Sequence, residues 1–271
     1  MEATLALHSP DLDATSAFSC DLALFMALPE EAAQISRRMR CGLRGGDGRL
    51  HGHLAERSVF LQITGQGPQA AELAARRLLS AHRPRFVMCA GLAGGLDDGL
   101  ERGRLIVAER TVDESGTCEL SANPDLLTRA ERLGATRASL LSLPRVICTV
   151  HEKRRLSARA SAVDMESLAV ARVAQEEGLP FVAIRVISDT SHEEFPINLN
   201  RYLRPDGGFD RGRLVLNALC RRGGLRFLLG LGATARTGAN SLADFVERML
   251  RQFPSSDAGT LSVSKTLHSK D

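Results

Sequence analysis

The apolar run Phe181–Ser188 limits the possible folds of this chain more than any other segment, because Arg185 alone interrupts it before the final serine. A strand that is apolar along its whole length is buried on both faces, as in sheets covered by helices on each side. The preceding segment carries apolar residues at helical spacing and ends at Gly178-Leu179-Pro180, which is typical of the end of a helix. We therefore expect a helix followed by a central strand.

Other short apolar runs alternate with helical patterns in the same way. We expect strands near Leu22–Ala27, Val59–Thr64, Arg85–Ala90, Leu105–Ala108, Arg145–Thr149 and Phe181–Ser188. We expect helices near Pro29–Met39, Pro68–Ala81, Pro124–Leu133, Met165–Glu177, Arg211–Cys220 and Ser241–Arg251. This alternation predicts an α/β protein, a three-layer α/β/α architecture with a central mixed, twisted sheet.

Length and composition favour one large domain. The chain has 271 residues, of which 44% are hydrophobic and 25% charged, so it can bury a sizeable core. We expect residues 1–19 to form a flexible leader, residues 20–253 a single domain and residues 254–271 a disordered tail. The net charge of +3, the single Tyr and the absence of Trp give no indication of nucleic-acid binding.

The cysteines and the N-terminus predict a cytoplasmic protein. The six cysteines form no C-x-x-C pair, and Cys89 and Cys148 lie in apolar runs that we expect to be strands. No signal peptide and no apolar stretch of transmembrane length is apparent. His51 and His53 alternate in a predicted strand without a third ligand nearby, so we predict no metal site.

The C-terminal region combines an apolar segment with many arginines. The segment Leu225–Gly232 is strongly apolar, and seven arginines lie between positions 201 and 226. The segment fits a core or subunit-interface helix. It also fits a surface for a lipid-like substrate, with peripheral membrane contact through the arginines.

Five short segments at the ends of predicted elements carry the candidate catalytic and binding residues. They are Met26–Glu31, Thr64–Pro68, Cys89–Leu96, Ala162–Ser167 and Ser188-Asp189. Because ligands bind at the carboxyl ends of strands in open α/β sheets, we expect the five segments to meet at one edge. None matches a dinucleotide fingerprint or a P-loop, so we predict no nucleotide cofactor.

The carboxylates in these segments also have purely structural interpretations. Acidic residues in the first turn of a helix suit its dipole, which accounts for Glu30 and Glu31 without any catalytic role. In the same way, Glu166 fits a helix cap and Asp189 fits the start of a turn.

Taken in order, the motifs resemble those of a known family. Ala-Leu-Pro-Glu-Glu, Thr-Gly-Gln-Gly-Pro-Gln-Ala-Ala, Ala-Gly-Leu-Ala-Gly-Gly-Leu, Val-Asp-Met-Glu-Ser and Ile-Arg-Val-Ile-Ser-Asp resemble the nucleoside phosphorylase superfamily over roughly residues 21–190. Within it, they are most similar to the methylthioadenosine/S-adenosylhomocysteine nucleosidases. The C-terminal part, from Leu203 to Arg226, looks more like hopanoid-associated members, which are thought to remove adenine from adenosylhopane.

The resemblance implies a different role for each carboxylate. Asp189 would protonate adenine at N7, and Glu31 would activate the attacking water, with Glu30 as the fallback. Glu166 would hold the ribose hydroxyls while Met165 packs against the sugar. The implied binding positions also include Ala93, Gly94, Gly65 and Ser188. Because Asp189 lies at a strand end, we expect its replacement by Asn to abolish adenine release with little change in stability.

The implied activity is hydrolysis of a 5′-modified adenosine without a cofactor, by a homodimer. Phosphorolysis is the rival reaction, but carboxylates follow the first strand where hexameric phosphorylases carry a phosphate-binding arginine. The methylthioadenosine enzymes usually place an aromatic residue after the strand that corresponds to Arg145–Thr149, and no aromatic residue is nearby here. We therefore expect a larger or more apolar 5′ group, with adenosylhopane as the leading candidate.

Two further alternatives remain open at this stage. The fold is compatible with a non-catalytic nucleoside-binding module, because fold does not determine activity. His192, three residues after Asp189, fits either a proton relay or a surface histidine.

Overall fold

The computed structural model describes residues 19–202, 204, 210–219 and 224–254. The first half of the chain contains β1 (Cys20–Met26), α1 (Pro29–Arg38), β2 (Arg40–Arg44), β3 (Arg49–Leu54), β4 (Arg57–Ile63), α2 (Pro68–Leu79), β5 (Pro84–Gly95), β6 (Leu105–Val112), β7 (Glu119–Ser121) and α3 (Pro124–Arg132). The second half contains β8 (Thr136–Ser142), α4 (Val150–Leu156), β9 (Ala162–Asp164), α5 (Ser167–Glu176), β10 (Phe181–Asp189), the 3-10 helix η1 (Leu199–Tyr202), α6 (Arg211–Leu219) and α7 (Gly224–Leu250).

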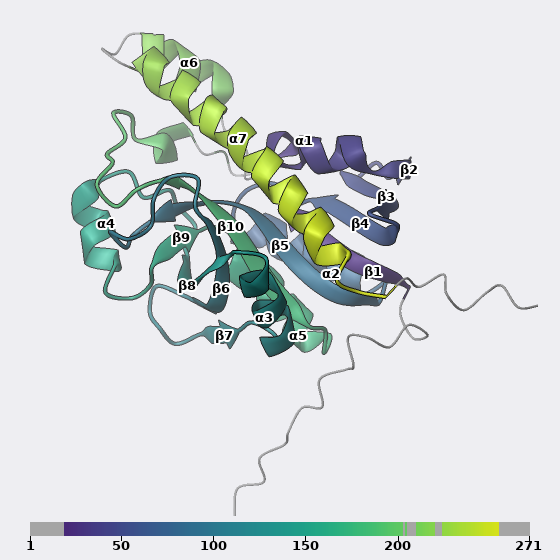
Figure 1. The fold of residues 1–271 in the computed structure, drawn as a ribbon. Coiled ribbons are helices and arrows are strands. Elements are labelled where there is room, and N and C mark those ends of the chain that lie inside the picture. The colour runs from purple at the N-terminus through teal and green to yellow at the C-terminus, as the bar shows by residue number, and fades with distance from the viewer. Residues whose placement is uncertain (1–18, 203, 205–209, 220–223, 255–271) are drawn as a thin grey trace, which may run out of the picture.

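The strands of the described residues form one mixed sheet (Figure 1). β1 pairs in parallel with β4 and β5, and β5 pairs in parallel with β10. β10 and β5 also belong to a closed circuit, since β10 continues through β6, β8 and β9 back to β5. This closure brings the C-terminal ends of β5, β9 and β10 together.

Alternate residues of the central strands pack against different helices. In β1, Leu22 and Leu24 face a core that includes side chains of α1, α3 and α7. Ala23 and Phe25 face a second core that includes side chains of α2 and α5. The sheet therefore lies between two helical layers, which confirms the predicted three-layer α/β/α fold.

The predicted strand Arg145–Thr149 is wrong, and Cys148 therefore does not lie in a strand. The segment is irregular because a side chain takes the place of a neighbouring strand. The Asn200 amide accepts a 2.8 Å hydrogen bond from the backbone N–H of Val146 and donates another of 2.8 Å to its carbonyl. The backbone N–H of Phe195 donates to the carbonyl of Cys148 at 2.9 Å.

Other boundaries also differ from the predictions. β8, Thr136–Ser142, was missed because its first two residues, Thr136 and Arg137, are polar and exposed. β5 extends through the glycines to Gly95, so these glycines lie in a strand instead of a turn. Helix α5 begins at Ser167 rather than at Met165.

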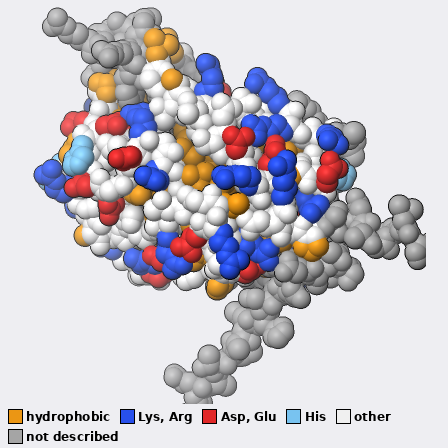
Figure 2. Space-filling view, viewed as in Figure 1, with side chains coloured by type: hydrophobic (Ala, Val, Ile, Leu, Met, Phe, Trp, Pro, Cys, Tyr) orange, Lys and Arg blue, Asp and Glu red, His pale blue; other side chains and the backbone are white. Residues whose placement is uncertain are grey.

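Helix α7 is much longer than the predicted Ser241–Arg251. Its C-terminal half is buried against the sheet, whereas its N-terminal half extends beyond the sheet beside α6 (Figure 1). Hydrophobic side chains are visible at this end of the molecule (Figure 2), where Val215, Leu216 and Leu229 are exposed. No helix in the described ranges combines the length and apolar character needed to cross a bilayer. The predicted leader and tail, apart from Ser19 and Pro254, lie outside the described residues.

Candidate active site

A cavity of about 210 Å³ lies where the five predicted segments meet. Its lining from these segments comprises Ala27, Leu28, Glu31, Gln66, Leu92, Ala93, Gly94, Val163, Asp164, Met165, Glu166, Ser188 and Asp189. The other lining residues are Arg145, Val146, Ile147, Arg185, Phe195, Leu199 and Ala235. The wall is largely apolar and contains a few carboxylates. A mostly apolar wall with a small number of polar groups is typical of a site for a small molecule.

Glu31 is placed at this cavity by the first turn of α1. Its side chain is 5% exposed, and its Oε1 lies 3.4 Å from the backbone nitrogen of Leu92, which donates to it. Oε2 is buried without a hydrogen-bond partner among the described residues. Burial raises the pKa of Glu31, and the positive charge of Arg185 only partly offsets this. Glu30, the fallback, is exposed and does not line the cavity.

Glu166 does not cap its own helix. Its Oε1 instead accepts a 2.8 Å hydrogen bond from the backbone N–H of Gly67, and its side chain faces the cavity. Asp164 performs the capping, since its Oδ2 accepts from the backbone N–H of Ser167 at 2.9 Å. Burial, followed by the nearby charge of Asp164, raises the pKa of Glu166 to about 7.

Arg185, the charged residue in the apolar run, lies among these carboxylates. It is 2% exposed, forms a close ion pair with Asp164 and donates to the hydroxyl of Ser167 at 2.8 Å. A side chain at Gly91 would place its Cβ 2.3 Å from Nη1 of Arg185. The glycine in β5 therefore leaves the space that the guanidinium occupies.

Asp189 ends β10 and is 5% exposed. Its Oδ2 lies 2.5 Å from Nζ of Lys153, and its Oδ1 lies 2.5 Å from the hydroxyl oxygen of Ser188. A Cβ at Gly94 would lie 3.2 Å from Oδ2 of Asp189, so this glycine allows the carboxylate to pack against β5. Asp189 is thus held by side chains rather than starting a free turn.

The remaining predicted residues separate into two groups. Met165, Ala93 and Ser188 line the cavity. Gly65 is not among its lining residues; it adopts a positive φ of 80°, and its N–H donates to the carbonyl of Ala27. His192 is also absent from the lining, and its Nε2 lies 3.3 Å from Oδ1 of Asp98 at an exposed position.

Several residues of the site were not predicted from the sequence. Phe195 brings an aromatic ring to the cavity that Ile147 also lines, although no aromatic residue lies near Arg145–Thr149 in the chain. This corrects the expectation of a wall without aromatic residues. Lys153 was missed because it lies in a run of charged residues, a pattern typical of an exposed helix. Arg185 could have been predicted from the sequence, because a charged residue inside a fully apolar strand needs buried partners.

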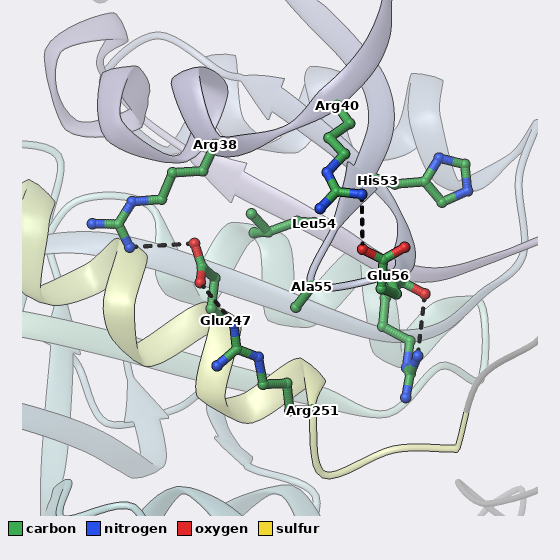
Figure 3. A pocket seen from close by; sticks show the side chains of 9 residues that line it. Arg38, Arg40, His53, Leu54, Ala55, Glu56, Glu247 and Arg251 are labelled. Carbon is green, nitrogen blue, oxygen red and sulfur yellow. Dashed lines mark hydrogen bonds and ion pairs between the residues drawn. The ribbon is translucent and has the colours of Figure 1, made fainter.

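A larger cavity of about 420 Å³ lies elsewhere, between the β3–β4 hairpin and α7 (Figure 3). Its charged groups pair with one another: Glu247 lies 3.3 Å from Arg38 and 3.4 Å from Arg251, and Glu56 lies 3.0 Å from Arg40. None of the five predicted segments reaches it. We therefore assign the chemistry to the smaller cavity, where carboxylates are buried.

The lining of the candidate site includes four carboxylates, of Glu31, Asp164, Glu166 and Asp189, and two guanidinium groups, of Arg145 and Arg185. No group of three or more His, Cys, Asp or Glu side chains is arranged for a metal ion in the part of the chain that the structure describes. The thiol of Cys89 lies 3.1 Å from Arg185, but burial raises its pKa to about 12, so it is not a ready nucleophile. The arrangement is suited to acid–base chemistry on a polar ligand.

Known proteins resemble this chain in sequence. The family model of the phosphorylase superfamily matches residues 21–204. The 5′-methylthioadenosine/S-adenosylhomocysteine nucleosidase of Geobacillus kaustophilus is 29% identical, over 67% of this chain and 89% of the relative. The enzyme of the same name from Shewanella halifaxensis is 25% identical, over 56% of this chain and 77% of the relative.

Solved structures agree on the fold. The 5′-methylthioadenosine/S-adenosylhomocysteine nucleosidase of Neisseria meningitidis, in complex with methylthio-immucillin-A, has a TM-score of 0.66 at 20% identity and covers 86% of this chain and 99% of its own. The futalosine hydrolase of Helicobacter pylori has a TM-score of 0.67 at 18% identity, with coverage of 86% and 98%. This family model matches more than half of the length of the chain. The chain therefore belongs to the phosphorylase superfamily.

Proposed function

We propose that this protein is a purine nucleosidase that hydrolyses the N-glycosidic bond of a 5′-modified adenosine and releases adenine. The observation that carries the proposal is that Glu31, Glu166 and Asp189 line one cavity, although they come from three distant segments. Hydrolysis of this bond needs an acid for the departing purine and a base for the attacking water. The nucleosidase names of the relatives support the same reaction.

Each carboxylate has an environment that suits a particular role. Glu31, with a raised pKa and an Oε2 that has no hydrogen-bond partner among the described residues, takes the proton of the attacking water. Glu166, held by Gly67, accepts hydrogen bonds from the ribose hydroxyls. Asp189 gives a proton to N7 of the purine. Met165, Ala93, Gly94 and Ser188 complete the binding wall, with Gly65 shaping the turn behind Gln66.

Water is a better nucleophile here than phosphate. The cavity holds one buried cation, Arg185, and its charge is already offset by its ion pair with Asp164 and by Glu166 at 4.0 Å. Arg145 at the rim is engaged by Glu114 and Glu152 at 2.9 Å and 2.8 Å. A phosphate dianion would therefore enter a site whose carboxylates repel it.

For the 5′ group, we propose a long apolar substituent, with adenosylhopane in hopanoid synthesis as the leading candidate. Leu28, Leu92, Leu199 and Ala235 give the cavity an apolar side, and Ala235 belongs to α7. The exposed Leu229 lies farther along the same helix. Methylthioadenosine or S-adenosylhomocysteine is the alternative, favoured by the relatives and by the ring of Phe195.

We further propose that residues 20–253 form one catalytic domain, that the enzyme is a cytoplasmic homodimer, and that the Arg-rich C-terminal region contacts membranes peripherally. The arginines between positions 201 and 226 and the apolar Leu225–Gly232 segment support that contact. A vesicle-flotation assay with anionic and neutral lipids tests it, and sedimentation gives the oligomeric state.

The decisive experiment measures adenine release by chromatography. The substrates are methylthioadenosine, S-adenosylhomocysteine and a 5′-long-alkyl adenosine, each with and without phosphate. Phosphate-independent release with a preference for the long-alkyl compound is the expected result. Strict dependence on phosphate would identify a phosphorylase, and the absence of release from all three would favour a nucleoside-binding module.

A further inference from the structure

A fully buried lysine stands behind the candidate acid. Lys153 is 0% exposed, and its Nζ lies 2.5 Å from Oδ2 of Asp189 and 2.6 Å from the carbonyl oxygen of Thr190. Nζ also lies 5.4 Å from the ring centroid of Phe195. An ammonium group in such a place needs a carboxylate next to it, because an unpaired buried charge is strongly destabilising.

Helix α4 directs this lysine inward. The helix begins after Thr149, whose hydroxyl accepts from the backbone N–H of Glu152 at 3.3 Å. Lys153 and Leu156, three residues apart, are its buried side chains, whereas Arg154 and Arg155 are exposed. Asp189 lines the candidate cavity and Lys153 does not, so Lys153 contacts Asp189 outside the cavity wall.

The ion pair has a consequence for acid catalysis. Both oxygens of Asp189 accept hydrogen bonds, one from the ammonium of Lys153 and the other from the Ser188 hydroxyl. A carboxylate accepts hydrogen bonds but has no proton to give. An acid that protonates a departing purine must therefore first receive a proton.

We propose that Lys153 supplies this proton through Asp189, an inference that rests on the proposed nucleosidase function. As the bond between the sugar carbon and N9 breaks, its electron pair moves to the purine. A proton passes from Nζ of Lys153 to the Asp189 carboxylate, and the carboxyl group gives a proton to N7. Neutral adenine and a neutral lysine result, while Glu31 takes the proton of the attacking water. The solvent then returns a proton to Lys153 and removes one from Glu31.

Burial makes this transfer easier than it is in water. An ion pair removed from water loses the solvation of both charges, whereas a neutral amine and a neutral acid lose much less. The negative charge that develops on the departing purine also attracts the proton forward. Lys153 is thus a positioning residue for Asp189 and the source of its proton, without contacting the substrate itself.

The experiment compares Lys153→Met, Lys153→Arg, Asp189→Asn and the double variant Lys153→Met/Asp189→Asn with wild type. Adenine release is measured from the best substrate of the full-length enzyme. Lys153→Met should lower kcat about 10²-fold or more, the range of a general-acid contribution. Lys153→Arg retains the positive charge but does not release a proton, so its kcat should also fall while its KM stays near the wild-type value.

The double variant separates a role through Asp189 from a general loss of structure. It removes both charges, so it avoids an unpaired ammonium and should fold even where Lys153→Met does not. Its kcat should equal that of Asp189→Asn alone, since the lysine acts through that group. Arg154→Met, an exposed change on the same helix, should keep wild-type activity.

The outcomes distinguish the two proposals. Wild-type kcat in Lys153→Arg would show that the charge alone matters and would overturn the proton transfer. A double variant much slower than Asp189→Asn would also overturn it, because the lysine would then act independently. If the wild-type enzyme releases no adenine, the proposed function itself fails, whatever the variants do.

Discussion

The backbone N–H of Gly67 donates a 2.8 Å hydrogen bond to Oε1 of Glu166, although 99 positions separate the two residues. Glu166 precedes α5 directly, where a carboxylate normally caps its own helix. Here Asp164 supplies the cap, and Glu166 is free to face the cavity. The two acidic residues of the motif Val-Asp-Met-Glu-Ser therefore have different roles: Asp164 caps the helix and Glu166 faces the cavity.

The pH dependence of stability follows from the environment of Glu166. Its pKa is raised to about 7 in the folded protein from an ordinary value of 4.5, so unfolding releases a proton between these values. The free energy of unfolding should therefore fall as pH rises from about 4.5 to about 7. In Glu166→Gln, the free energy of unfolding should fall by about 3 kcal/mol less over this pH range than in the wild type. Urea denaturation at both ends of the range measures the difference. An unchanged pH dependence in the variant would contradict the raised pKa.

Glu31→Gln tests the base that activates water. The substitution keeps the size of the side chain and removes its ability to take a proton, so kcat should fall about 10²- to 10⁴-fold. Binding of adenosine compounds should persist, as measured by calorimetry. Glu30→Gln, an exposed change in the same helical turn, is the matched control and should retain full activity. Full activity in Glu31→Gln would show that the base is assigned wrongly.

Asp189→Asn should lower kcat for adenine release about 10²- to 10⁴-fold and also destabilise the protein. The second effect replaces the expectation from the sequence, because the structure pairs Asp189 with the fully buried Lys153. Loss of the carboxylate leaves a buried ammonium without its counter-charge, at a cost of about 3 kcal/mol or more. Urea denaturation measures this loss, and unchanged stability would argue against the ion pair.

Gly91→Ala should disturb the site through Arg185. The added Cβ would lie 2.3 Å from Nη1 and 3.2 Å from Oε2 of Glu31, so the guanidinium must move. We expect lower kcat and a stability loss of about 1–3 kcal/mol from overpacking. Gly232→Ala in α7, where no heavy atom lies within 4 Å of the added Cβ, should instead stabilise the helix by up to about 1 kcal/mol. Equal effects of the two changes would contradict this account.

The apolar end of α7 can be tested with Leu229→Asp, since Leu229 is 67% exposed. If this end contacts a long 5′ substituent, the change should raise KM for a long-alkyl adenosine severalfold and leave methylthioadenosine almost unaffected. Leu73→Asp, at a similarly exposed position on α2, is the control and should affect neither substrate. The side chain of Leu228, in the same apolar segment Leu225–Gly232, lies outside the described side chains, so the test uses Leu229.

Much of the fold could be predicted because its signals are local. β1, β5 and β10 are buried on both faces, so their runs are apolar whatever their neighbours are. β8 begins with two exposed, polar residues, Thr136 and Arg137, and gave no such signal. The apolar segment Arg145–Thr149 gave a false one, because the side chain of Asn200 binds its backbone in place of a strand.

The sequence by itself determined the central apolar strands and the helices beside them, and it placed Glu31, Glu166 and Asp189 at the ends of such elements, since periodicity and turn residues act between near neighbours in the chain. Only the tertiary structure decided which groups meet. Lys153 and Asp189, 36 positions apart, form a buried ion pair, and Phe195 lines the same cavity as Ile147. A lysine in a charged helix has the same sequence pattern whether it is exposed or buried. Its environment depends on packing between distant segments, and so does its chemistry.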